Sequence, residues 1–271
     1  MRTESPSFFT LTCLAGLAAA LIFVGFPKLD LAVAELFYIG KRHFLADPSL
    51  LGNVLRQSFR LLFLIAAIVA LFGVGLSVVT GRKLFGFGFP HWLAVVLALF
   101  IGPGLIANVL FKDNWGRARP HHVEQFGGPK EFTPALKYTD QCERNCSFVS
   151  GEASSIYAVF FALALLVRRR RREIFLLGLA IGTLAGIMRI ASGSHFLSDV
   201  VFAGVFMGLS VRGAFWLVFE RAPGTFAEGG PLHCYLHRKA MGMAGRIAAF
   251  RRRVFGTGQR LADRVAASLA L

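Results

Sequence analysis

Six long apolar segments are the feature that most limits how this 271-residue chain can fold. Each is close to the ~20 residues that a helix needs to cross the ~30 Å hydrocarbon core of a bilayer. The segments cover approximately residues 8–26, 61–79, 91–111, 153–167, 174–190 and 198–219. The fourth and fifth are short, and we expect neighbouring polar residues to extend them. The sequence therefore predicts an all-α, polytopic membrane protein with six transmembrane helices.

Composition supports the membrane class. Hydrophobic residues make up 55% of the chain and charged residues only 17%, with a mean hydropathy of +0.59. These values are typical of integral membrane proteins. The first apolar segment is long and only Arg2 precedes it as a basic residue, so we interpret it as a retained helix rather than a signal peptide.

Positive charge predicts the orientation in the membrane. The net charge is +15, and five consecutive arginines, Arg168 to Arg172, separate two apolar segments. Such charge could indicate nucleic-acid binding, but basic runs that flank membrane spans are typical of cytoplasmic loops. We therefore expect no nucleic-acid partner and place this run in the cytoplasm. With six spans, both termini then lie in the cytoplasm as well.

The chain divides into a predicted transmembrane domain, residues 1–222, and a basic cytoplasmic tail, residues 223–271. From about residue 236, apolar residues recur at spacings of three, four or seven among arginines, which indicates an amphipathic helix. Gly256 and Gly258 are expected to break this helix in two. We expect the tail to lie on the anionic lipids of the inner leaflet.

Three polar segments occur where apolar segments end: 112–120, 150–152 and 189–199. On the predicted topology all three lie on the same, non-cytoplasmic face. Charged residues at such positions are costly to bury and are usually functional. The three segments are therefore expected to form one site.

The residue types in these segments suit a phosphate ester. Lys112, Arg119 and Arg189 can neutralise phosphoryl oxygens. His195 is the natural nucleophile, with Asp199 four residues later to hold its ring and to stabilise the positive imidazolium. Read alone, the pair could also be a histidine and an acid that cap a helix.

Other polar residues near these segments are further candidates for the site. Ser150 and Gly151 precede a predicted helix start, so their backbone amides would point at an anion. Arg117 could touch a second phosphate or extend to the membrane interface. Cys142 and Cys146 would form a small disulfide loop if this region faces an oxidising compartment. The loop offers too few ligands for zinc, so we expect no metal and no other cofactor.

Together these motifs resemble the type 2 phosphatidic acid phosphatase (PAP2) superfamily, whose signature is K-x6-RP, PSGH and SR-x5-H-x3-D. Lys112 to Pro120 matches the first element in full. Arg189, His195 and Asp199 match the third, with Met188 in place of serine. The second element here is Ser-Gly-Glu after Val149, so its proline and histidine are both changed. The resemblance spans roughly residues 60 to 220.

This resemblance implies a six-helix membrane phosphatase that works without a metal. Its third-motif histidine would attack phosphorus to give a phosphohistidine, which water hydrolyses. By this resemblance His195 is the nucleophile and Asp199 orients it. The residues expected to bind the phosphate are Lys112, Arg119, Ser150, Gly151 and Arg189.

Glu152 departs from the family pattern, because the family's histidine at this position is the proposed general acid. Glutamate has a reference pKa of ~4.3 against ~6.5 for histidine, so it could donate a proton only if burial raised its pKa. Alternatively, Glu152 binds the sugar or amine of the substrate. In a third interpretation, the protein is impaired as a phosphatase.

The chain resembles the bacterial branches of the superfamily, which predicts the inner membrane as its location and the periplasm as the side of its active site. The leading hypothesis is removal of a lipid A phosphate, at the 1- or the 4′-position. Alternative substrates are phosphatidylglycerophosphate, phosphatidic acid and undecaprenyl pyrophosphate. A different class of function is a non-catalytic protein that binds or transports phospholipid. The sequence leaves the oligomeric state open.

Overall fold

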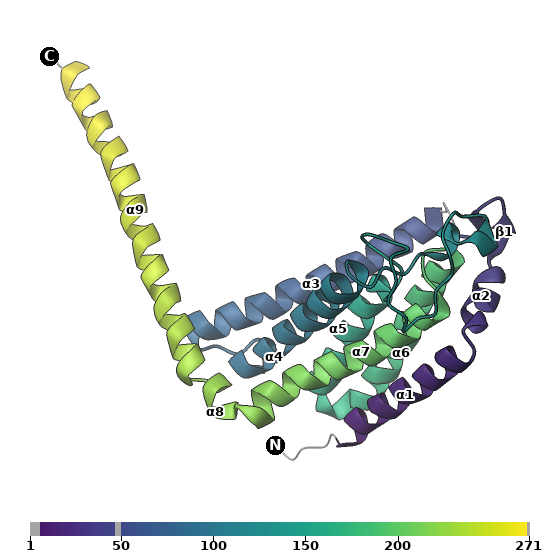
Figure 1. The fold of residues 1–271 in the computed structure, drawn as a ribbon. Coiled ribbons are helices and arrows are strands. Elements are labelled where there is room, and N and C mark those ends of the chain that lie inside the picture. Colours follow the sequence, from purple (N-terminus) through teal and green to yellow (C-terminus); the bar gives the residue numbers. More distant parts are fainter. Residues whose placement is uncertain (1–5, 47–49, 270–271) are drawn as a thin grey trace.

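The apolar segments fold into long helices that lie side by side in the computed structural model, which describes residues 6–46 and 50–269 (Figure 1). Within these residues, five helical stretches are long and apolar enough to cross a membrane. They are α1 (Pro6–Gly25), α3 (Leu50–Thr80), α4 (Phe89–Leu99) with the π-helix that continues it (Phe100–Lys112), α6 (Arg171–Ala191), and α7 (Leu197–Trp216) with a π-helical end (Leu217–Arg221).

A sixth apolar helix, α5 (Gly151–Leu166), has only 16 residues. The prediction of a helical chain with several candidate membrane spans is confirmed, but five rather than six helices have the length of a span. The small elements are α2 (Lys28–Glu35), the antiparallel strands β1 (Tyr38–Gly40) and β2 (His43–Phe44), three 3₁₀ turns (Pro120–His122, Glu124–Phe126 and Arg168–Arg170) and α8 (Pro223–Phe226).

Helices α5 and α6 form a tight antiparallel pair, because glycines on α6 let the two backbones approach. A Cβ atom on Gly178 would lie 2.4 Å from Phe160, and one on Gly182 would lie 2.3 Å from the Tyr157 ring. Small residues at a helix interface have this role in membranes generally. The Tyr157 hydroxyl also hydrogen-bonds Thr183, with 3.0 Å between the oxygens. The pairing brings the start of α5 and the end of α6 to the same end of the bundle.

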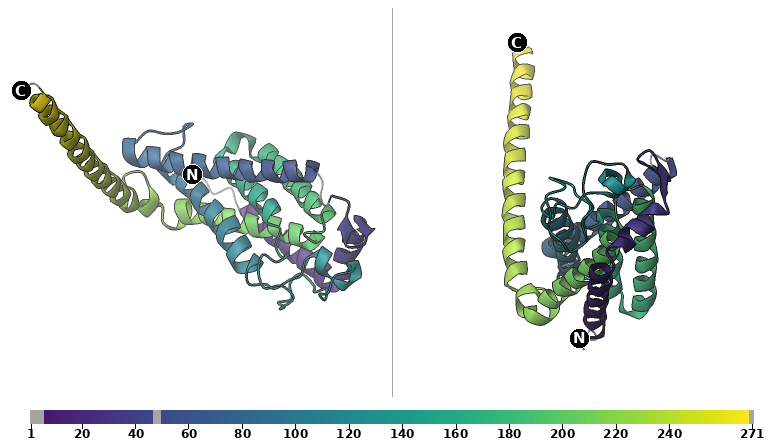
Figure 2. Two further views of the ribbon diagram at one scale, coloured as in Figure 1. Left: turned by 90° about the horizontal axis from the view of Figure 1, so that it is seen from above. Right: turned by 45° about the vertical axis from the view of Figure 1, so that its right-hand side comes forward.

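The C-terminal helix α9 (Pro231–Leu269) leaves the bundle near α8 and projects away from it in Figure 1 and in the left view of Figure 2. It runs through Gly256 and Gly258 without interruption, so the predicted break is wrong. Propagating an existing helix costs little even at a glycine, roughly 1 kcal/mol relative to alanine. Its first turns contact the end of α3, where His237 Nδ1 lies 2.6 Å from the carbonyl oxygen of Val78. Beyond residue 250 only the backbone is described.

Candidate active site

The three polar segments meet at one end of the bundle, opposite α8 and the five arginines (Figure 1). The π-helix after α4 ends at Lys112, α5 begins at Gly151, α6 carries Arg189 in its last turn, and His195 lies in the connection to α7. This convergence is the one that the topology argument predicted. It follows from the antiparallel order of α5, α6 and α7.

A polar pocket of about 230 Å³ opens where these segments meet. Its lining includes Lys112, Arg119 and Arg189, the three cations predicted to bind phosphate. Arg56, from the first turns of α3, also lines it and was not predicted. A small pocket walled by four cations is suited to a dianionic phosphate monoester.

Glu152 lies among these cations. One of its carboxylate oxygens, Oε1, is 3.3 Å from Arg56 Nε and 3.5 Å from Arg189 Nε. The other, Oε2, is 3.9 Å from His195 Nε2. The carboxylate therefore lies between the nucleophile and the pocket, where a phosphoryl group would have to bind. Arginines at these distances favour its ionised form.

His195 is fully buried and its ring is held in one tautomer. Nδ1 lies 2.6 Å from the backbone carbonyl oxygen of Ser147. Because a carbonyl only accepts, Nδ1 carries the proton and Nε2 keeps its lone pair. Nε2 has no hydrogen-bond partner among the described residues. The ring is thus prepared for attack through Nε2.

Burial lowers the pKa of His195 to about 4. The neighbouring Asp199 opposes this shift and the charge of Lys112 adds to it. We expect the ring to remain neutral, and therefore nucleophilic, until the pH falls through about 4, whereas a histidine with the reference pKa of ~6.5 is mostly protonated at pH ~5.5. Carbon-13 NMR of labelled histidine, assigned by difference from a His195→Asn variant, measures this. A His195 ring that protonates near pH 6.5 would contradict the expectation that burial keeps it neutral.

Several hydrogen-bond donors of the site converge on the Asp199 carboxylate. Its carboxylate accepts hydrogen bonds from the Arg117 guanidinium, the Ser147 hydroxyl and the backbone N–H of Phe196. Its Oδ2 is 3.6 Å from His195 Nδ1, too long for a hydrogen bond. The predicted pairing of Asp199 with His195 is therefore present as a contact at ion-pair distance rather than as a hydrogen bond. Asp199 also holds the ring indirectly, because it accepts a hydrogen bond from Ser147, whose carbonyl oxygen holds Nδ1.

The start of α5 fits a close approach of Lys112. A Cβ atom on Gly151 would lie 2.9 Å from Lys112 Nζ, so a larger residue would push the ammonium group aside. Ser150 is fully buried as the residue before the helix, and its backbone N–H donates to the carbonyl oxygen of Asp199 at 3.1 Å. The predicted pair Ser150 and Gly151 thus joins α5 to α7 and leaves room for the cation.

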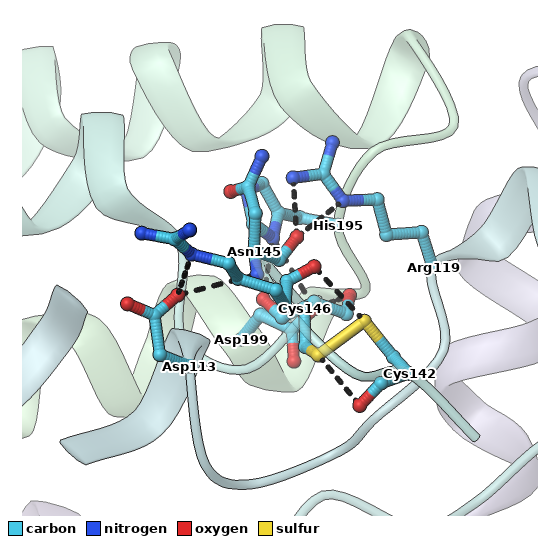
Figure 3. The surroundings of a disulfide bond; sticks show 9 residues. Asp113, Arg119, Cys142, Asn145, Cys146, His195 and Asp199 are labelled. Atoms are coloured by element: carbon cyan, nitrogen blue, oxygen red, sulfur yellow. Dashed lines mark hydrogen bonds and ion pairs between the residues drawn. A yellow bond between two sulfur atoms is a disulfide. The ribbon is translucent and has the colours of Figure 1, made fainter. Parts of the chain in front are cut away.

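A disulfide joins Cys142 and Cys146 beside the site (Figure 3). Within its loop, the carbonyl oxygen of Asn145 accepts two hydrogen bonds from Arg119, at 3.1 Å from Nε and 2.7 Å from Nη2. The backbone N–H of Cys146 donates to the carbonyl oxygen of Lys112 at 2.8 Å. The loop therefore fixes the position of the Arg119 side chain.

Arg117 lies in a different environment from the one that the sequence predicts. It was expected to touch a second phosphate or to reach the membrane interface. Instead it is fully buried and pairs with Asp30 of α2 and with Asp199. Asp30 and Ser147 were not predicted as site residues.

Within the described residues, no group of three or more His, Cys, Asp and Glu side chains could hold a metal ion.

Comparison with known proteins agrees with this geometry. The family described as the PAP2 superfamily matches residues 91–223, which include all three motifs. A lipid A 4′-phosphatase of Francisella tularensis subsp. novicida is 37% identical over 209 residues, covering 74% of this chain and 89% of the relative. The chain belongs to the PAP2 superfamily. It is a phosphatase.

Other relatives of this PAP2 phosphatase are named either lipid A 4′-phosphatase or lipid A 1-phosphatase. A lipid A 4′-phosphatase of Rhizobium leguminosarum is 33% identical over 198 residues, covering 66% of this chain and 83% of the relative. A lipid A 1-phosphatase of Rhizobium etli is 33% identical over 151 residues, covering 53% of this chain and 59% of the relative. No solved structure matches this PAP2 phosphatase.

Proposed function

We propose that this PAP2 phosphatase removes a phosphate group from lipid A, at the 4′-position. The observation that carries the proposal is the 37% identity to a lipid A 4′-phosphatase over most of both chains. The relatives named 4′-phosphatases also cover more of this chain than those named 1-phosphatases. The 1-phosphate is the better leaving group, so chemistry alone would favour it, and the position needs a direct test.

The proposed reaction has two steps. Lys112, Arg119 and Arg189 bind the phosphoryl oxygens, and the lone pair on His195 Nε2 forms a bond to phosphorus while the bond to the sugar oxygen breaks. The sugar oxygen leaves with the electron pair and takes a proton from water. Nδ1 keeps its proton throughout, hydrogen-bonded to the Ser147 carbonyl. Water then forms a bond to phosphorus while the Nε2–P bond breaks, and the proton that this water loses neutralises the hydroxide left by the first step. Inorganic phosphate is released and the ring is neutral again.

Glu152 has a different role in this proposal from the histidine of the family pattern. Its contacts with Arg56 and Arg189 favour the ionised carboxylate, which has no proton to donate. In the absence of substrate this carboxylate occupies the place of the phosphoryl group. Substrate must displace it, and its oxygens can then accept hydrogen bonds from the sugar or the amide of the lipid.

Replacing Glu152 with glutamine separates these roles. We expect KM for lipid A to fall by about fivefold, the factor that corresponds to an ion pair of ~1 kcal/mol, and inhibition by inorganic phosphate to strengthen. The expected change in kcat is small. Steady-state phosphate release measures both constants. A fall in kcat of about 10²-fold or more with unchanged KM would identify Glu152 as the general acid and contradict this interpretation.

We infer a topology with six transmembrane helices and a periplasmic active site. The five arginines lie between α5 and α6 at the opposite end of the bundle from Lys112 and His195, which supports placing them on the cytoplasmic side. Helix α5 would then complete the sixth span, although it is short, because it packs against its neighbours. Both termini would lie in the cytoplasm of a bacterial cell, with the enzyme in the inner membrane.

The proposed domains are the transmembrane phosphatase, residues 1–222, and the basic tail, residues 223–271. On α9, Met243, Ile247 and Phe250 are each at least 60% exposed although they are apolar. Apolar side chains interleaved with basic ones on an exposed helix are typical of interfacial helices. We propose that the tail lies on the anionic surface of the inner leaflet.

The function is tested by phosphate release from purified, detergent-solubilised protein. Lipid A, phosphatidylglycerophosphate, phosphatidic acid and undecaprenyl pyrophosphate are offered in parallel, with His195→Ala as the control. The proposal expects the highest kcat/KM with lipid A and the loss of the 4′-phosphate by mass spectrometry. Preference for another lipid would support one of the alternative substrates. Tight binding without release from any lipid would indicate the non-catalytic binding protein.

A further inference from the structure

Behind the pocket lies a buried ionic cluster formed by Asp30, Arg117, Ser198 and Asp199. None of its members is more than 1% exposed. Asp30 comes from α2, Arg117 from the loop part of the first motif, and the other two from the first turn of α7. Arginine and aspartate are almost never buried to this extent unless they are paired. The cluster thus needs an explanation that a phosphate-binding role does not give.

Arg117 joins the two carboxylates through its planar fork. Its Nη1 donates to Asp199 Oδ1, its Nη2 donates to Asp30 Oδ2 at 2.8 Å, and its Nε donates to the carbonyl oxygen of Thr133 at 3.0 Å. A lysine could not make these three bonds from fixed directions. The guanidinium therefore sets the distance between Asp30 and Asp199.

Ser198 closes the cluster from the other side. Its backbone N–H donates to Asp30 Oδ1 at 2.8 Å and its hydroxyl donates to Asp30 Oδ2. The same hydroxyl oxygen accepts a hydrogen bond from Arg117 Nη1 at 2.8 Å. Asp30 is thus bonded to both the arginine and the start of α7, the helix that carries Asp199.

The cluster continues to the nucleophile through Ser147. Asp199 Oδ2 accepts a hydrogen bond from the Ser147 hydroxyl, and the Ser147 carbonyl oxygen holds His195 Nδ1 at 2.6 Å. Movement of Asp199 would move Ser147, and with it the ring. A continuous path of bonds therefore runs from α2, at the N-terminal side of the chain, to the atom that attacks phosphorus.

The net charge of the cluster is opposite in sign to the charge that forms on the His195 ring during the reaction. Two carboxylates and one guanidinium leave one negative charge buried while His195 is neutral. When Nε2 bonds to phosphorus the ring becomes positive, and Asp199 lies 3.6 Å from Nδ1. The buried negative charge is balanced only when the ring becomes positive. It therefore stabilises the phosphorylated ring, and the transition state that leads to it, relative to the free enzyme.

From these contacts we propose that Asp30 and Arg117 are positioning residues of the phosphatase, which hold Asp199 and Ser147 so that His195 is aligned and its positive charge is stabilised. Asp30 lies outside residues 91–223, the part matched by the PAP2 superfamily. Helix α2 therefore completes the active site of this chain. The inference rests on the proposed role of His195 as nucleophile.

The test is Asp30→Asn, which keeps the shape of the side chain and removes its charge. We expect kcat for lipid A to fall by about 10- to 100-fold, by analogy with the loss of a partner that orients a metal-binding histidine. KM should stay within about twofold, because Asp30 is not among the residues that line the pocket. Glu35→Gln, an exposed acid at the end of the same helix, is the matched control and should behave as wild type.

Two further measurements separate positioning from mere folding. The double variant Asp30→Asn/Asp199→Asn should be no slower than Asp199→Asn alone, because both act through one path. If Asp30→Asn does not fold, Arg117→Lys replaces it and should lower kcat with KM unchanged. A folded Asp30→Asn protein with wild-type kcat, or single effects that multiply in the double variant, would overturn the inference.

Failure of the inference and failure of the proposed function give different results. If the wild type releases phosphate from lipid A and His195→Ala does not, the proposed function stands and the Asp30→Asn rate decides the inference. If the wild type releases nothing, or His195→Ala is as active as the wild type, the proposed function fails and the inference falls with it.

Discussion

Replacing His195 with alanine is expected to lower kcat for phosphate release by ~10³-fold or more, since loss of a covalent nucleophile removes the pathway itself. KM should change little, because Lys112, Arg119 and Arg189 remain to bind the phosphoryl group. The buried ring contacts Ser147, so the variant must also be shown to fold, by its elution from a sizing column and its thermal unfolding. Steady-state phosphate release from lipid A gives both constants.

The control for this experiment is His43→Ala, an exposed histidine on the β-hairpin that should keep wild-type activity. Comparable activity in folded His195→Ala would show that another group attacks phosphorus. It would also leave unexplained why Nε2 of the buried ring has no hydrogen-bond partner among the residues that the structure describes.

The second large effect is expected for Asp199→Asn. The amide cannot accept hydrogen bonds from Arg117, Ser147 and Phe196 all at once, because one of its two ends is a donor. The charge that would balance the positive ring is lost as well. We expect kcat to fall by about 10³- to 10⁴-fold, by analogy with the loss of the orienting carboxylate in a catalytic triad.

KM and kcat must be measured separately for this variant. The predicted fall in kcat alone would show that Asp199 acts through His195. A rise in KM alone would mean instead that Asp199 shapes the phosphate pocket. The exposed Asp140, changed to asparagine, is the matched control. Wild-type kcat in folded Asp199→Asn would contradict the positioning role.

The sequence predicts the helices well because an apolar segment long enough to span a bilayer has few alternatives to a helix. Their ends are predicted less well. Helix α3 begins at Leu50, well before the apolar segment at residue 61, since its backbone hydrogen bonds continue through polar residues such as Arg56 and Arg60. Apolar periodicity detects the part of a helix that faces lipid. It does not detect a polar turn that faces the site.

The sequence likewise predicts some residues of the candidate site and not others. Lys112, Arg119, Arg189, His195 and Asp199 were predicted because their spacing places them at helix ends that must meet. Asp30 could not be predicted, because its contact with Arg117 joins residues 87 positions apart. Ser147 holds His195 through its backbone carbonyl, which every residue type possesses. Arg117 was visible in the sequence, but nothing there indicated that two buried carboxylates would receive its side chain.

The most direct test of the account is to look for phosphate bound to His195 during turnover. Lipid A labelled with radioactive phosphorus is mixed with the purified protein, the reaction is stopped rapidly in alkali, and the protein is digested and sequenced. We expect an acid-labile, alkali-stable label on the peptide that contains His195, formed by wild type and absent from His195→Ala. Rapid release of phosphate with no labelled protein at any time would contradict it.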